Sequence, residues 1–149
     1  AMSETLRYGA IMLAAGVGIP VLAALNAQLG GRIGSPTAAA VVLFAVAMCV
    51  ALGAMVLGQG SGGLSRLAGQ PGHLFLGGVL VVFYVLAVTF VALRFGVGNA
   101  VFFVLLGQMV SAAVIDQFGL FGALVRPVTL MRAAGIGCMG LGLLLIQRG

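Results

Sequence analysis

The sequence has very few charged side chains. Seven arginines, no lysine and two acidic residues are distributed over 149 positions, so that charged residues make up 6% of the chain and hydrophobic residues 62%. A typical soluble domain is about a quarter charged. Nine charges cannot form the polar surface that a soluble domain of this length needs. The composition therefore predicts an integral membrane protein.

Other residue types are also scarce, and their scarcity excludes several classes of protein. Cys49 and Cys138 lie in long apolar runs, where a thiol acts as a small hydrophobe, so a disulfide scaffold is not expected. One histidine and two separated cysteines indicate no metal site, and we predict no cofactor. The arginines occur singly rather than in a stripe, which argues against a nucleic-acid partner. Catalysis needs convergent reactive groups, and the sequence offers no such set, so we predict no enzyme and no catalytic residues.

The charges divide the chain into five uncharged intervals. A helix needs about 20 mostly apolar residues to cross a bilayer, and each of the first four intervals is long enough. The fifth becomes long enough if Thr129 caps its helix and Arg132 extends back to the interface. We therefore predict an all-α membrane protein with five transmembrane helices in a single domain, 1–149. The predicted spans are 8–29, 36–58, 74–93, 98–116 and 129–147.

Glycine and proline suggest where these helices begin and bend. Gly34-Ser35-Pro36 predicts a loop, an N-cap and a proline at the first position of the second helix. Pro20 lies inside the first span with Gly16 and Gly18 nearby, which predicts a kink and a freed backbone carbonyl near mid-membrane. The alternative is that glycine and proline are simply common in membrane helices.

The arginines are almost equally divided between the two sides of the membrane. The side richer in Lys and Arg stays cytoplasmic, so the balance sets the orientation. With five spans, four arginines fall on one side of the membrane: Arg7, Arg66, Arg126 and Arg132. Three fall on the other side: Arg32, Arg94 and Arg148. So small a bias predicts that the chain inserts in both orientations and that two copies pair antiparallel, as an inverted repeat does. Alternatively, a partner protein sets the orientation.

Small residues on the last span predict close helix packing. At about 100° per residue, Ala133, Gly137 and Gly140 form one narrow stripe, which we assign to dimer packing. A second stripe on the far side consists of Ala134, Gly135, Cys138 and Gly142. Both stripes could instead pack within one bundle.

Three segments carry a resemblance to a known family. They are the stretch from Leu76 to Gly122, Asn26-Ala27-Gln28-Leu29-Gly30, and the ending from Arg126-Pro127 through the glycine-rich last helix. Together they resemble the YdcZ-like inner-membrane exporters of the drug/metabolite transporter superfamily. The second half, 77–146, also resembles the last three helices of the small multidrug resistance proteins, which work as antiparallel dimers. The resemblance implies a drug/metabolite-transporter-like bundle. It also implies a small, dimeric or paired, multi-pass transporter of the bacterial inner membrane.

The sequence departs from the small multidrug resistance pattern in its first span. Those proteins place a glutamate in the middle of the first helix, where it binds protons and cationic drugs in turn. The first span here contains no acid, and its strongly polar residues are Asn26 and Gln28. Proton-coupled export of cations by that mechanism is therefore not predicted.

Polar side chains inside the membrane are costly and usually face a bundle interior or a wet cavity. Those within the spans are Asn26, Gln28, Tyr84, Thr89, Gln108, Ser111 and Asp116. Asn26 and Gln28 project about 200° apart, so only one can line a given cavity, and we choose the deeper Asn26. Gln108 and Ser111 share a face. We predict a substrate cavity lined by Asn26, Tyr84, Gln108 and Ser111, although Gln108 could instead form an interhelical hydrogen bond and Tyr84 could be a packing residue.

Asp116 is the only acid beyond the N-terminal segment, and two roles are open to it. If it is buried it could carry a proton. If it pairs with an arginine of the following connection, it would stay charged and be structural.

These features and the resemblance predict a small-molecule transporter, most simply an exporter. It would work by alternating access as an antiparallel homodimer. Its partners would be membrane lipid, a second copy and a small molecule of unknown identity. A cavity with few charges favours neutral, zwitterionic or amphipathic substrates. The alternative is a non-transporting membrane subunit that assembles with another membrane protein.

Overall fold

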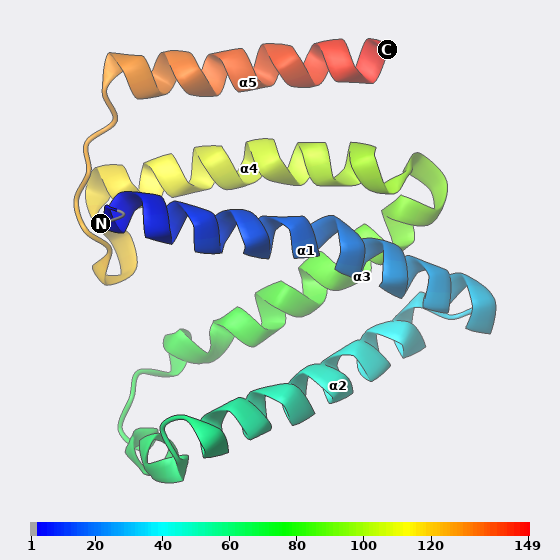
Figure 1. Ribbon diagram of the computed structural model, residues 1–149, viewed down its shortest axis with the longest axis vertical. Helices are drawn as coiled ribbons and strands as arrows, with labels where there is room; N and C mark the ends of the chain where they lie inside the picture. The colour runs from blue at the N-terminus through cyan, green and yellow to red at the C-terminus, as the bar shows by residue number, and fades with distance from the viewer. Residues whose placement is uncertain (1–2) are drawn as a thin grey trace. The chain divides into compact units, whose positions relative to one another are not determined.

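The computed structural model describes residues 3–149, which are almost entirely helical and contain no strand (Figure 1). Five helices are long and apolar enough to cross a membrane. They are α1 (Glu4–Ile33), α2 (Pro36–Leu57), α3 (Gly77–Phe95), α4 (Val97–Phe118) and α5 (Leu130–Arg148). Short 3₁₀ turns occur at Ser61–Arg66, Gly72–Leu76 and Leu120–Gly122.

The prediction of an all-α membrane protein with five spanning helices is confirmed, and each observed helix coincides with one predicted span. The largest difference is in α1, which extends about one turn beyond the predicted span at each end. Arg7 and Arg32 lie in these added turns, because a helix continues past the hydrocarbon core while its charged side chains reach the interface. The arginines therefore do not mark the ends of this helix.

The helix ends follow the local sequence. Gly34 adopts a left-handed conformation (φ 69°) that ends α1, and the Ser35 hydroxyl accepts a hydrogen bond from the Ala38 N–H, with Pro36 at the start of α2. This confirms the predicted loop, cap and proline. The predicted cap of the last helix is confirmed as well, because the Thr129 hydroxyl accepts a hydrogen bond from the Arg132 N–H at 3.1 Å.

The chain forms two compact parts, which we describe separately: one extends to Val97 and the other is Gly98–Gly149. In the first part, α1 contacts both α2 and α3. Only the C-terminal half of α1 packs against these helices, since every residue from 4 to 18 is exposed.

Helix α1 continues through Pro20, whose missing N–H leaves the Gly16 carbonyl without its usual helical partner. The kink at Pro20 stays a prediction, as does the single domain.

The second part consists of α4, α5 and the connection between them, and the two helices run antiparallel (Figure 1). The chain turns sharply after α4, where Gly119 has a φ of 61°. A Cβ at Gly119 would lie 2.6 Å from Val125 Cγ2, so a larger residue would require Val125 to shift, and the left-handed φ itself favours glycine. The connection then runs in extended form to Thr129 and begins α5.

Candidate functional site

The best-packed region of the first part is a junction of small residues where α1, α2 and α3 meet. Its buried members are Ala23, Asn26, Ala27, Gly30, Ala39, Ala40, Val85, Val88, Thr89 and Ala92. A Cβ added at Gly30 would lie 3.2 Å from Pro36 Cα and 3.5 Å from Thr89 Cγ2. In membranes, helices associate by such close packing of small residues, because lipid is as apolar as the side chains it replaces.

A hydrogen bond between two buried polar side chains crosses this junction. Asn26 Nδ2 donates to Thr89 Oγ1 at 2.6 Å, and the Thr89 hydroxyl donates to the Val85 carbonyl of its own helix at 2.7 Å. Asn26 is 4% exposed and Thr89 is 1% exposed. The bond therefore ties α1 to α3 in an apolar environment. In this structure Asn26 lies in the contact between α1 and α3, and its role in a substrate cavity stays a prediction.

Tyr84, the second predicted cavity residue, lies on α3 and is half-buried. It projects about 140° around the helix from Thr89, the partner of Asn26. The structure thus places Asn26 and Tyr84 in the same three-helix part but pairs Asn26 with Thr89.

Gln108 and Ser111, the other two predicted cavity residues, lie together on an exposed face of α4. The residues of α4 that line clefts toward α5 are on the opposite side of the helix and include Leu106, Val110 and Ala113. Within the second part, Gln108 and Ser111 therefore face away from α5. An amide and a hydroxyl on one exposed face of a spanning helix are available to a ligand or to another helix.

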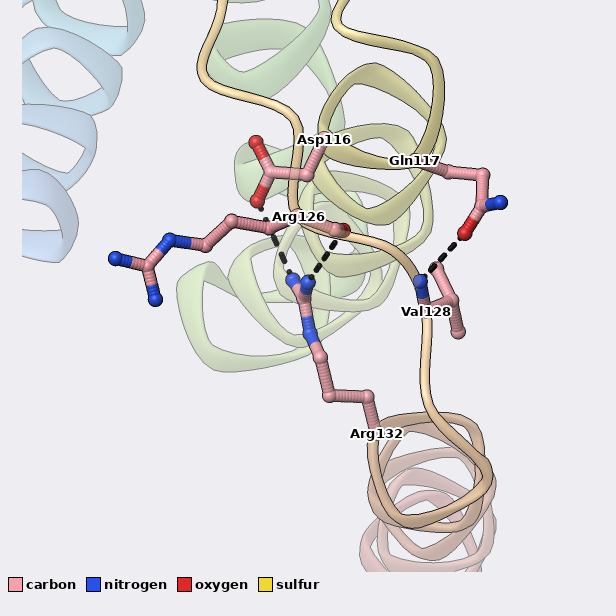
Figure 2. A network of polar contacts seen from close by, with 5 residues as sticks. All are labelled: Asp116, Gln117, Arg126, Val128 and Arg132. Carbon is pink, nitrogen blue, oxygen red and sulfur yellow. Dashed lines mark hydrogen bonds and ion pairs between the residues drawn. The ribbon is translucent and has the colours of Figure 1, made fainter.

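Asp116 lies near the end of α4 and forms an ion pair with Arg132 of α5, with Arg132 Nη2 3.4 Å from Asp116 Oδ2 (Figure 2). The two side chains are 34% and 38% exposed, respectively. Arg132 also donates from Nη1 to the Arg126 carbonyl at 3.3 Å. The structure thus pairs Asp116 with the arginine in the first turn of α5, just beyond the connection.

The backbone of the connection is held to the end of α4 at two further points. The Arg126 N–H donates to the Asp116 carbonyl at 2.7 Å. The Val128 N–H donates to Gln117 Oε1, as Figure 2 shows. These bonds satisfy backbone groups that an extended segment would otherwise expose near the membrane. The connection is therefore a defined structure and not a loose loop.

The opposite end of the α4–α5 pair has its own polar contact. Gln147 Nε2 of α5 donates to Asn99 Oδ1 of α4 at 3.1 Å. Between the two polar ends the helices leave apolar clefts of 350 and 170 Å³. The pair is thus joined by polar contacts at its ends and packed only loosely along its middle.

The stripe assigned to dimer packing is divided by the structure. Ala133 lines the cleft toward α4 together with Ile136, whereas Gly137 is exposed and Gly140 is half-buried. A Cβ added at Gly137 or Gly140 would meet nothing within 4 Å in the described chain. The two glycines of the stripe are therefore open to lipid or to another helix.

Sequence reasoning identified Asn26, but it did not connect Asn26 to Thr89. The available signal was the position of Thr89 on α3, where Val85 and Ala92 lie four residues before it and three after it on the same helix face. A threonine among small and β-branched residues at that spacing indicates a polar contact within a helix interface. No group of three His, Cys, Asp or Glu side chains that could hold a metal occurs in residues 3–149.

Comparison with known families agrees with this architecture. The family model described as "Putative inner membrane exporter, YdcZ" matches residues 8–145, which include nearly all of the five spanning helices. No curated protein and no solved structure shows a significant match to the chain. An exporter is a transporter and not a class of enzyme. The chain belongs to the YdcZ family of inner membrane exporters, as a multi-pass protein of the inner membrane.

Proposed function

We propose that the protein exports small molecules by alternating access and that two copies in opposite orientations form the working unit. The observation that carries the transport function is the family match along 8–145, over five helices that can span the membrane. Alternating access requires two halves that exchange conformations around a central site, and an antiparallel pair of identical chains would supply them.

The substrate would contact the polar face of α4. Gln108 and Ser111 are exposed there, on the side away from α5, and a polar face at membrane depth favours a wet cavity over lipid. Tyr84 would contribute an aromatic wall from α3. Asn26 would border the cavity, held by its bond to Thr89 in the state described here and released in the other. The site would contain no unpaired charge, which favours neutral, zwitterionic or amphipathic substrates.

The antiparallel arrangement is supported by the arginines and by α5. The four-to-three division of arginines provides little bias toward either orientation. In the stripe of Ala133, Gly137 and Gly140, the two glycines leave room for the backbone of a second helix to approach closely. We propose that this stripe forms part of the contact between the two copies.

We further propose that transport is not coupled through a carboxylate of the first helix. The only acid in α1 is Glu4, at its N-terminal end, and Asp116 is engaged with Arg132. Asp116 would therefore have a structural role in holding the connection between α4 and α5.

Flux measurements in liposomes test the transport function and its site. Purified protein would be reconstituted and assayed with a panel of neutral, zwitterionic and amphipathic metabolites and drugs. Gln108→Leu should abolish most of any flux, because it removes the polar group from the exposed face. Gln28→Leu is a matched control, since Gln28 is also an exposed glutamine of a spanning helix but faces elsewhere. No flux for the whole panel, or equal losses in both variants, would contradict the proposal.

Topology mapping tests the antiparallel arrangement independently. Two reporters would be attached in turn to the C-terminus, one active only in the cytoplasm and the other only outside it. Dual orientation predicts comparable activity from both. Activity from a single reporter would refute the antiparallel homodimer and leave the transport function to the flux assay.

A second candidate function is that of a non-transporting subunit of a membrane complex. It is favoured by the first half of α1, where residues 4–18 are exposed although they belong to a spanning helix. A partner protein could cover that surface. Cross-linking in native membranes separates the two candidates, because a homodimer captures a second copy whereas a subunit captures a different protein.

A further inference from the structure

We propose that the connection between α4 and α5 binds the headgroup of an anionic phospholipid through Arg126. The connection, 119–129, joins two membrane-spanning helices and therefore lies at a membrane surface. Its polar groups and its exposed apolar side chains together fit a molecule that has a phosphate at one end and hydrocarbon at the other.

The two arginines of this region have different surroundings. The guanidinium of Arg132 is occupied by Asp116 and by the Arg126 carbonyl. The guanidinium of Arg126 is exposed and makes no hydrogen bond or ion pair to any of residues 3–149, and it points away from Asp116 and Arg132 (Figure 2). Since Asp116 already pairs with Arg132, the positive charge of Arg126 is not compensated.

The backbone of Arg126 is held although its side chain is not. Its N–H donates to the Asp116 carbonyl, and its own carbonyl accepts from Arg132. A side chain that extends from a fixed backbone loses less conformational freedom on binding than one on a loose loop. A guanidinium can also donate two parallel hydrogen bonds to a phosphate group.

Arg126 borders an open hollow of 720 Å³. The hollow is lined by Leu124, Val125, Arg126, Pro127, Thr129 and Arg132. Charge and apolar surface therefore occur side by side in one concave region, and no acidic side chain lines it.

Apolar side chains around this hollow distinguish a lipid from a free anion. Leu124 and Val125 line the hollow and are 79% and 64% exposed, and Leu130 and Met131, at the start of α5, are exposed as well. Such side chains next to a spanning helix would insert among acyl chains, whereas free phosphate would leave them in water. The apolar surroundings therefore favour a phosphate that is carried on a lipid.

Native mass spectrometry of the purified full-length chain tests the proposal. Detergent-solubilised protein would be titrated with phosphatidylglycerol, and separately with phosphatidylcholine. We expect tighter binding of phosphatidylglycerol, and a loss of at least about tenfold in Arg126→Gln, which corresponds to one charge-assisted hydrogen-bonded contact. Arg66→Gln is the matched control, because it removes one exposed arginine from another loop. General surface attraction amounts to about 1 kcal/mol per arginine, so the control should lose about fivefold or less.

Two results would overturn the proposal. Equal losses in Arg126→Gln and Arg66→Gln would show attraction by net charge only. Displacement of the lipid by millimolar inorganic phosphate would show an anion site that does not recognise the lipid. Because the side chain of Arg126 makes no contact that holds the fold, the variant should elute from gel filtration as the wild type does. Binding by Arg126→Lys at a level between wild type and Arg126→Gln would support the phosphate contact.

Discussion

Replacing Thr89 by valine should weaken the contact between α1 and α3, because valine keeps the shape of threonine and removes its hydroxyl. The change deletes the 2.6 Å bond from Asn26 and leaves that amide unpaired at a position only 4% exposed. It also removes the bond from Thr89 to the Val85 carbonyl, which as a helical carbonyl keeps its backbone partner. Interhelical hydrogen bonds in membranes contribute about 0.6–1.7 kcal/mol, so we expect a loss of about 1–2 kcal/mol in the free energy of unfolding.

The measurement is reversible unfolding in mixed micelles of a mild detergent and sodium dodecyl sulfate, followed by circular dichroism. A double-mutant cycle with Thr89→Val and Asn26→Leu isolates the pair, and we expect a coupling energy of about 0.6–1.7 kcal/mol. Thr37→Val is the matched control, since Thr37 is exposed on α2 and should change stability by less than about 0.5 kcal/mol. Two results would refute the role of this hydrogen bond: additive effects of the two substitutions, or a Thr89→Val variant with the same free energy of unfolding as the wild type.

Three further predictions concern packing and charge. Gly30→Val should destabilise the protein by about 1–3 kcal/mol in the same unfolding assay, because even a Cβ would approach the backbone at the start of α2. Gly53→Ala, on an open face of α2, should be neutral or slightly stabilising, and equal effects of the two changes would contradict the close approach. Asp116→Asn should cost no more than about 1 kcal/mol because both members of its ion pair are more than one third exposed, and a larger loss would indicate a buried role. Gly137→Leu should reduce self-cross-linking in membranes and leave the unfolding of the single chain unchanged. Cys138→Leu, on the other stripe, should change neither the cross-linking nor the unfolding. Equal cross-linking in the two variants would contradict a role of the first stripe in the interface.

The elements of the fold were predictable from the sequence because the bilayer imposes a simple rule on them. Each spanning segment must be about 20 apolar residues long and must satisfy its own backbone, so length and charge spacing locate the helices. The caps were predictable for a similar reason. Ser35 and Thr129 accept hydrogen bonds from N–H groups three residues further along the chain, and such local contacts need no knowledge of the fold.

The polar contacts between helices were only partly predictable. Asp116 and Arg132 lie on either side of one connection, and their pairing was one of two roles that the sequence left open. Asn26 and Thr89 are 63 residues apart, and nothing in their neighbourhoods specifies that they meet. Lipid-facing and protein-facing sides of a membrane helix have similar hydrophobicity, so the pattern of apolar residues does not reveal which face packs.

By itself, the sequence determined that this is a membrane protein with five helices, which segment each helix occupies, and how evenly its arginines are divided. These properties depend on the transfer of each segment from water to lipid, which is a sum over neighbouring residues. The tertiary structure decided that Asn26 bonds Thr89, that Arg132 is engaged while Arg126 is not, and that Gln108 faces away from α5. Those outcomes depend on the directions of side chains on packed helices, which only the folded chain establishes.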